Sequence, residues 1–148
     1  MKQLTFALQF KGNGAPVPGS DNRLRAKTIA SSQALKAVLG ATGVQATVEP
    51  MDRTTAVFES EVQITGQGTF IESGSIAYGT AGQVAFKTVG QGIIGPSGMD
   101  DLQRGAVIWE VTAGDGQFAG ATGLITSNFT LTGKGEVVDN QFAQLFVK

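Results

Sequence analysis

The sequence contains no histidine and no cysteine. Their absence excludes His-containing catalytic triads, thiol nucleophiles, disulfides, Cys/His zinc sites and haem held by His or thiolate. Trp and Tyr occur once each, and 12 acidic against 11 basic residues give a net charge of −1. Carboxylates, Lys/Arg and hydroxyls are the groups left for chemistry. They define no particular reaction, so whether the protein is an enzyme stays open.

The chain also lacks a long apolar segment and an overall basic charge. No run of 18 or more apolar residues occurs, and residues 1–6 alternate instead of forming the apolar region of a signal peptide. A net charge of −1 provides no basic field for nucleic acid or an anionic membrane. We therefore expect a cytoplasmic protein that binds neither of them.

The charges are unevenly distributed along the chain. Residues 1–40 carry six Lys/Arg and one acid, whereas residues 41–148 carry five Lys/Arg and eleven acids. Opposite charges attract, so this asymmetry favours contact between the two parts of the chain, within one subunit or between subunits.

Glycine, in contrast, is abundant: 21 of the 148 residues are Gly, about twice the usual share. Gly-x-Gly recurs at residues 66–68, 90–92, 114–116 and 133–135, at spacings of 24, 24 and 19 residues. Such spacings fit two strands and two turns of a β-meander. A meander of about eight strands removes its exposed edges by closing on itself. We therefore predict an all-β protein, a single domain over residues 1–148 that forms a closed antiparallel barrel.

Alternating apolar residues locate the strands of this barrel. Leu4, Phe6, Leu8 and Phe10 share one face of the first strand, and Phe58 lies on the predicted inward face of a long strand over residues 54–65. Residues 31–40 instead have a helical pattern, with a serine cap, Ala34, Leu35, Val38 and Leu39 on one face, and Gly40 at the end. We predict one short helix near residues 32–39.

Two further patterns do not predict a cofactor or a metal. Residues 90–95 match G-x-G-x-x-G, but residues 96–101 continue as a loop where a dinucleotide site requires a helix. Asp100, Asp101 and Asp115 offer oxygen ligands, yet Gly-Asp-Gly is an ordinary turn sequence. We expect neither a cofactor nor a bound metal.

The most informative segment is Gly114-x-Gly116-x-Phe118-Ala119-Gly120-Ala121-x-Gly123. It resembles the G-x-G-x-F-x-G-A-x-G hairpin of the allene oxide cyclase and dirigent barrels, a superfamily that includes small bacterial barrels with no assigned function. The bacterial group is the closer match, because its members share with this chain a short length, Gly-x-Gly hairpins and a last strand rich in Phe and Val, here residues 140–147. The resemblance is specific over residues 105–132. It implies a barrel of about eight strands that forms homodimers or homotrimers, and it implies no activity, because no functional residue can be matched.

Within this segment, we place Gly120 and Gly123 where the strand leaves the turn and passes close to its neighbour. A Cβ atom at either position is expected to clash or to require an unfavourable φ.

Strand 106–112 holds the candidate catalytic residue, Glu110. Trp109 and Glu110 must face opposite sides of the strand. With Glu110 inside, desolvation would raise the pKa of its carboxyl and suit it to acid/base work. With Trp109 inside, the barrel has an aromatic wall and Glu110 faces water. The cost of burying an unpaired carboxylate favours the second arrangement.

Two functions fit these observations. The first is binding of an apolar small molecule inside the barrel, beside Trp109, Tyr78 and Phe58, with or without an isomerase or cyclase activity. The second is a non-enzymatic oligomeric scaffold with a packed interior. A cavity of about 300 Å³ or more with a few polar groups would favour the first.

Overall fold

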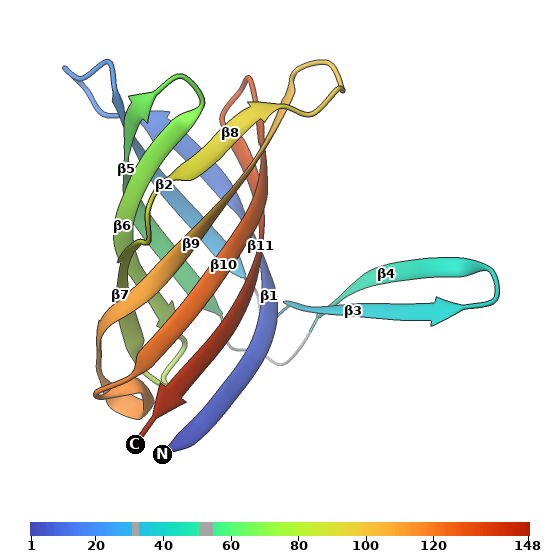
Figure 1. Ribbon diagram of the computed structural model, residues 1–148, viewed down its shortest axis with the longest axis vertical. Helices are drawn as coiled ribbons and strands as arrows, with labels where there is room; N and C mark the ends of the chain where they lie inside the picture. The colour runs from blue at the N-terminus through green and yellow to red at the C-terminus, as the bar shows by residue number, and fades with distance from the viewer. Residues whose placement is uncertain (31–32, 51–54) are drawn as a thin grey trace.

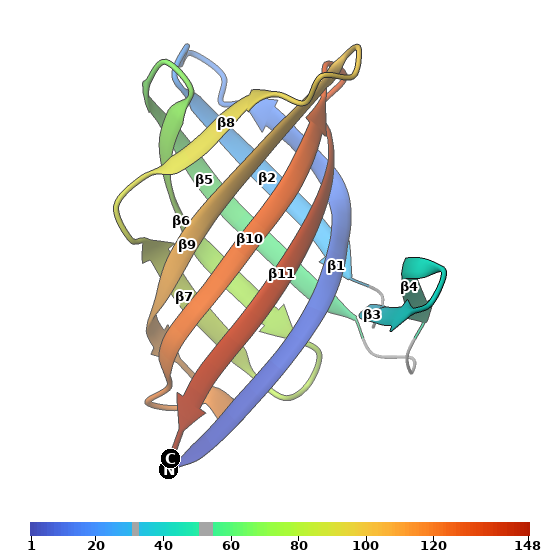
Figure 2. The ribbon, with the colours of Figure 1, turned by 45° about the vertical axis from the view of Figure 1, so that its right-hand side comes forward.

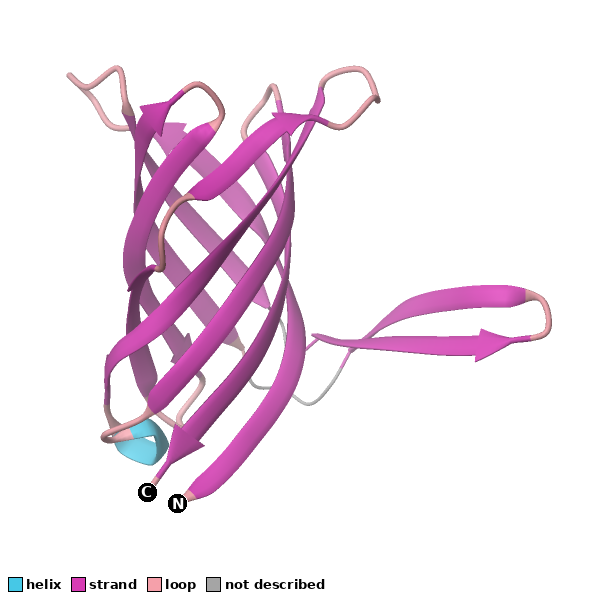
Figure 3. Cartoon of the chain, in the orientation of Figure 1, coloured by secondary structure: helices cyan, strands magenta, loops and turns pink. Residues whose placement is uncertain are grey.

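The alternating segments form strands in the computed structural model, which describes residues 1–30, 33–50 and 55–148. Over these residues the chain forms eleven strands and one 3-10 turn, η1 (Gly116–Phe118) (Figures 1 and 3). The strands are β1 (Lys2–Pro16), β2 (Arg23–Ala30), β3 (Gln33–Gly40), β4 (Gly43–Pro50), β5 (Ala56–Gly66), β6 (Thr69–Tyr78), β7 (Gln83–Thr88), β8 (Gly92–Pro96), β9 (Leu102–Gly114), β10 (Thr122–Thr132) and β11 (Glu136–Val147). None of the described helices is long and apolar enough to cross a membrane.

The sheet closes because the first and last strands pair with each other. The order β11-β10-β9-β7-β6-β5-β2-β1 is completed by antiparallel pairing of β1 with β11, from Lys2↔Val147 to Asn13↔Glu136 (Figure 2). Strands β7 and β8 both pair with β6 and β9, so they occupy one position in the barrel. The predicted closed antiparallel barrel of about eight strands is confirmed.

The four Gly-x-Gly segments lie at strand ends, as predicted. Residues 66–68 and 133–135 turn the chain between β5 and β6 and between β10 and β11, and residues 114–116 lead from β9 into η1. Residues 90–92 differ, because they join β7 to β8 where the strand is interrupted. In this segment Gly90 has φ +69°, a conformation that glycine adopts readily.

The predicted helix near residues 32–39 is wrong. Residues 33–40 form β3, which pairs with β4 in a hairpin that projects from the side of the barrel (Figure 1). The turn closes at Gly40↔Gly43 with Gly43 at φ +110°, and β-branched residues follow it in β4. A helix of this length has little stability of its own, and residues 33–40 instead pair along their whole length with β4 and at Leu8↔Ala34 with β1. Ser31 and Ser32, the predicted cap, lie outside the described residues.

The inward faces of the strands form one apolar core. The first strand turns Leu4, Phe6, Leu8 and Phe10 inward, as its alternation predicts. On β5, Phe58 is buried and packs inside the barrel, as predicted, while Thr54 of the same predicted strand lies outside the described residues. The largest of the other core side chains are Phe70, Ile76, Phe86, Trp109, Phe118, Ile125 and Leu145.

Candidate functional site: a cavity inside the barrel

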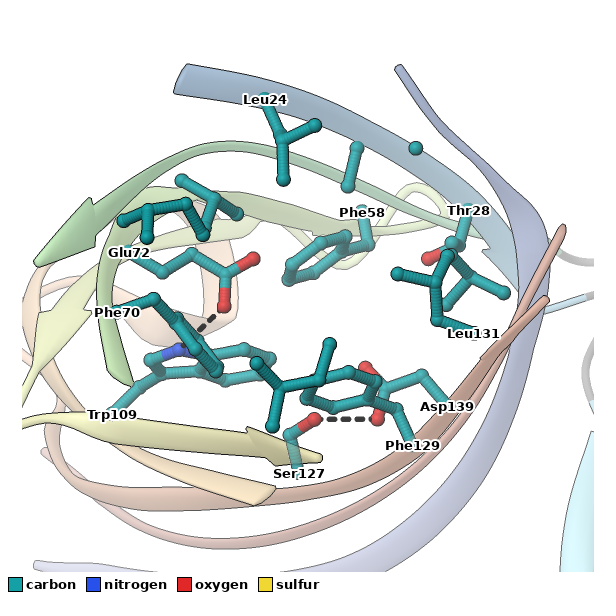
Figure 4. A pocket seen from close by; sticks show the side chains of 16 residues that line it. Leu24, Thr28, Phe58, Phe70, Glu72, Trp109, Ser127, Phe129, Leu131 and Asp139 are labelled. Atoms are coloured by element: carbon teal, nitrogen blue, oxygen red, sulfur yellow. Dashed lines mark hydrogen bonds between the residues drawn. The ribbon is translucent and has the colours of Figure 1, made fainter. Parts of the chain in front are cut away.

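The barrel contains a cavity of about 90 Å³. Its mouth lies at the end that carries the β1–β2, β5–β6 and β10–β11 turns, where half-buried Leu24, Ile64, Leu131 and Val137 form an apolar rim. Deeper in the barrel the lining is fully buried and includes polar groups (Figure 4): Thr28, Phe58, Glu72, Trp109, Ser127 and Asp139. The cavity therefore leads from an apolar entrance to buried carboxyl groups.

Glu72 is the first of these carboxyls. It points inward from β6, between Phe70 and Ile76 on the same face of the strand. Ser60 Oγ donates a hydrogen bond to its Oε1 at 2.5 Å, and Trp109 Nε1 donates to its Oε2 at 3.2 Å. Burial raises the pKa of Glu72 to about 7. The hydrogen bonds from Ser60 and Trp109 lower this pKa, and the nearby negative charge of Asp139 raises it.

The interruption between β7 and β8 lies beside Glu72. The Thr88 hydroxyl accepts a hydrogen bond from the Glu72 backbone N–H at 2.7 Å and donates one to the Glu72 backbone carbonyl at 2.8 Å. The Thr88 side chain thus replaces the backbone hydrogen bonds that Glu72 would make if the neighbouring strand were continuous. Thr88 holds the backbone of Glu72 in place where β7 ends.

Asp139 is the second buried carboxyl, and it points inward from β11. Ser127 Oγ on β10 donates to its Oδ1 at 2.6 Å, and Gln141 Nε2 donates to its Oδ2 at 2.8 Å. Burial raises the pKa of Asp139 to about 6, while the hydrogen bonds from Ser127 and Gln141 act in the opposite direction. Both carboxyls are therefore poised to change protonation near neutral pH.

No described basic side chain compensates the two carboxyls. Every described Lys and Arg is exposed, and the described ion pairs, such as Lys87–Glu110 at 3.3 Å, lie on exposed side chains. Among the described residues, the Thr28 hydroxyl, which lines the cavity, and Gln141 Oε1 are buried without a hydrogen-bond partner. The interior thus holds polar groups whose bonding capacity is not used within the described chain.

The sequence-predicted site residues are only partly brought together. Trp109 is 1% exposed and stacks on Phe58 with ring centroids 5.3 Å apart, and both line the cavity. Tyr78 instead packs against Phe6 and Phe118 near η1, outside the cavity lining. Of the two arrangements of strand 106–112, the one with Trp109 inside is confirmed. Glu110 lies on the outer face beside Lys87 and is not an internal carboxylate.

Comparisons of the chain with protein families, with curated proteins and with solved structures found no match. The resemblance of residues 114–123 to the allene oxide cyclase and dirigent hairpin therefore stays a prediction. In the structure, Asp115 of that hairpin accepts a hydrogen bond from the Gln83 backbone N–H at 2.8 Å, which connects the hairpin to the start of β7. Within the described residues, no three acidic side chains are grouped as a metal site would require.

Sequence analysis missed both Glu72 and Asp139. The alternation of inward and outward residues along a strand could have placed both inside. Glu72 is on the same face as the core residues Phe70 and Ile76, and Asp139 is on the same face as Leu145. The first signal is obscured in the sequence by Gly74, because a glycine inside an apolar pattern is typical of the end or interruption of a strand. The second was ambiguous because both faces of β11 carry large apolar side chains, with Phe142 and Phe146 on the outside.

Proposed function

We propose that this protein binds a small molecule in the barrel interior, at the cavity between Trp109, Glu72 and Asp139. One observation carries the proposal: two carboxyls, and a Thr28 hydroxyl with no partner among the described residues, are buried where the cavity lies. Burying such groups without a charge partner is costly, and barrel closure does not require them. Departures from an apolar core of this kind are typical of functional sites.

The size of the cavity limits the ligand. About 90 Å³ is less than the roughly 300 Å³ that would favour ligand binding by size, so the proposal depends on the buried polar groups. It is also less than the roughly 150 Å³ of a cavity that holds benzene. Since a cavity of about 150 Å³ holds the six carbon atoms of benzene, a cavity of about 90 Å³ holds a ligand of about four non-hydrogen atoms. A larger ligand would have to extend past the apolar rim.

Trp109 fluorescence tests this proposal directly, because Trp109 is the only Trp in the chain and lines the cavity. We expect blue-shifted emission, and a saturable change when isopropanol or isopropylamine is added at pH 8. Ala26→Phe places a large side chain in the cavity and should abolish the response. Ala85→Phe, on the opposite face of β7 from the core residues Val84 and Phe86, should retain it. An emission indifferent to both compounds would contradict the proposal.

An isomerase or cyclase activity stays a prediction. Glu72, in place of Glu110, is the group suited to it, because its pKa of about 7 allows it both to accept and to donate a proton near neutral pH.

Self-association is a second proposed function, and the β3–β4 hairpin favours it. The hairpin exposes Leu39 and Val44, at 80% and 71%, and an isolated two-stranded hairpin is marginally stable in water. On the barrel, the outward positions of β1 from Gln3 to Gln9, and the positions of β11 and β10 in register with them, carry no charge; the charged Lys11 and Glu136 lie beyond this stretch. The uncharged positions are Gln3, Thr5, Ala7, Gln9, Asn140, Phe142, Gln144, Phe146, Thr122, Leu124, Thr126 and Asn128. Interfaces are depleted in charge and enriched in aromatics, so a second copy of this chain fits this wall.

Sedimentation at micromolar concentration tests self-association. We expect a species larger than the 15.3 kDa monomer, and Leu39→Asp should shift it toward the monomer because the charge would be buried against the partner. Met99→Asp, at an exposed loop position, is the matched control and should leave the assembly intact. A wild-type chain that sediments only as a monomer would refute the scaffold function.

A further inference from the structure

The hydrogen-bond inventory of the cavity has more acceptors than donors. An ionised carboxylate has about four acceptor sites, and each of the two buried carboxylates receives two hydrogen bonds. The Ser60, Ser127 and Trp109 donors are used in these bonds. Gln141 Oε1, which is also buried without a partner among the described residues, does not line the cavity, so the free acceptors there are those of the two carboxylates and Thr28. A ligand that complements this interior must supply donors.

The charge of the interior also favours a ligand that donates hydrogen bonds. All four hydrogen bonds are donated to the carboxyl oxygens, an arrangement that supports the ionised forms of Glu72 and Asp139. No other described Asp, Glu, Lys or Arg lines the cavity. Two negative charges with no described counter-charge make a cation the favoured occupant.

Aromatic rings complete the surroundings. Figure 4 shows Phe58, Phe70, Trp109 and Phe129 around the space between the two carboxyls. Phe58 stacks on Trp109, and Phe70 meets Phe129 edge to face at 6.0 Å. Ring faces attract organic cations, and their apolar area receives alkyl groups. The lining thus combines anionic oxygens with aromatic walls.

We propose that the ligand of this cavity is a small organic ammonium ion, whose N–H groups bind the carboxylates of Glu72 and Asp139 and the hydroxyl of Thr28. This inference rests on the proposed function, and it names the class of ligand. An alkylammonium group has three donors and no acceptor, which matches the surplus of acceptors. The Thr28 hydroxyl, 1% exposed and without a partner among the described residues, points toward the same space; its oxygen can accept an N–H of the ligand, and its own O–H is the one donor that the lining leaves free.

Other ligand classes fit less well. A calcium ion takes six to eight oxygen ligands, and within the described chain no three acidic side chains are grouped to provide them. An anion would be repelled by both carboxylates. A neutral ketone or ester brings acceptors to a site that already has too many.

Three probes of four non-hydrogen atoms each separate these classes: isopropylammonium, isopropanol and acetate. Amide chemical shifts of the full chain, titrated with each probe at pH 8, give the affinities. We expect a dissociation constant between tens of micromolar and millimolar for isopropylammonium, the range open to a ligand of this size. Isopropanol should bind at least about tenfold more weakly, because it brings one donor and no charge. Acetate should not bind.

Variants and pH then test the assigned contacts. Glu72→Gln and Asp139→Asn should each weaken isopropylammonium binding by about tenfold or more, whereas Glu110→Gln on the outer face should leave it unchanged. Lowering the pH from 8 to 5 should also weaken binding by about tenfold or more. Over this range Glu72 and Asp139, which have pKa values of about 7 and 6, become protonated, while the amine stays charged.

The outcomes distinguish the two proposals. If isopropanol binds as tightly as isopropylammonium, or if neither carboxyl variant changes the affinity while both remain folded by circular dichroism, the ammonium inference is wrong and binding in the cavity stands. If none of the three probes shifts the amides of the cavity lining, both are wrong. Tenfold preference for the cation, lost in either carboxyl variant, supports both.

Discussion

Glu72→Gln is expected to raise the melting temperature at pH 8 by about 5 °C or more and to flatten the dependence of stability on pH. Glu72 has a pKa raised from 4.5 to about 7, and Asp139 one raised from 3.8 to about 6, mainly by burial. The folded state therefore holds these protons more tightly than the unfolded state. Glutamine keeps the shape of Glu72 and removes the charge that must be buried above neutral pH.

The sign of the pH dependence follows from linkage. Where the folded state binds more protons than the unfolded state, the free energy of unfolding decreases as pH rises. Stability is full below about pH 3, where both carboxyls are protonated in the folded and in the unfolded state, and it is lost as pH rises through about 6 and 7. At about 1.4 kcal/mol per pKa unit, the two rises together correspond to a loss on the order of 6 kcal/mol.

Thermal unfolding between pH 4 and pH 8 measures this effect. The wild type should be least stable at the upper end, and Glu72→Gln and Asp139→Asn should each remove about half of the slope. Glu110→Gln is the control, since this exposed group pairs with Lys87 outside the barrel and should change the profile little. A wild-type stability that rises steadily from pH 4 to pH 8 would show that the two carboxyls are not buried as described.

Gly123→Ala is expected to lower the free energy of unfolding by about 3 kcal/mol or more. Gly123 has φ +129°, and an added Cβ would overlap the backbone oxygen of Gln144 and lie 2.9 Å from Leu145 Cα. Positive φ costs an L-residue about 1–2 kcal/mol, and displacing the neighbouring strand costs about 1–3 kcal/mol more. β11 cannot shift freely, because it is paired on both sides, with β10 and with β1.

Gly120→Ala provides the matched comparison. Gly120 has φ +69°, but the nearest atoms to its Cβ position belong to the Lys148 side chain, at 3.7 Å and beyond. At Gly120 the predicted unfavourable φ is therefore confirmed and the predicted close approach is not, whereas at Gly123 both are confirmed. Urea unfolding should give a loss of about 1–2 kcal/mol for Gly120→Ala, from φ alone. Equal losses in the two variants would contradict the close approach at Gly123.

The barrel itself was predictable because its determinants are local. Alternating residues such as Leu4, Phe6 and Phe58 assign faces to strands, and Gly-x-Gly segments mark their ends. The β3–β4 hairpin was not predictable in this way. Its first strand has an apolar pattern that also suits a helix, and only pairing with residues 43–50 decides between the two.

The sequence alone therefore determined the fold class, the inward position favoured for Trp109, and the absence of His and Cys chemistry. Only the tertiary structure decided which carboxyls are inside the barrel. Burial of a carboxyl depends on which face of its strand turns inward and on whether neighbouring strands bring hydrogen-bond donors to it. Glu72 on β6 meets Ser60 from β5 and Trp109 from β9, and Asp139 on β11 meets Ser127 from β10. These partners are 12 to 37 residues apart in the chain, and barrel closure brings them together around one cavity.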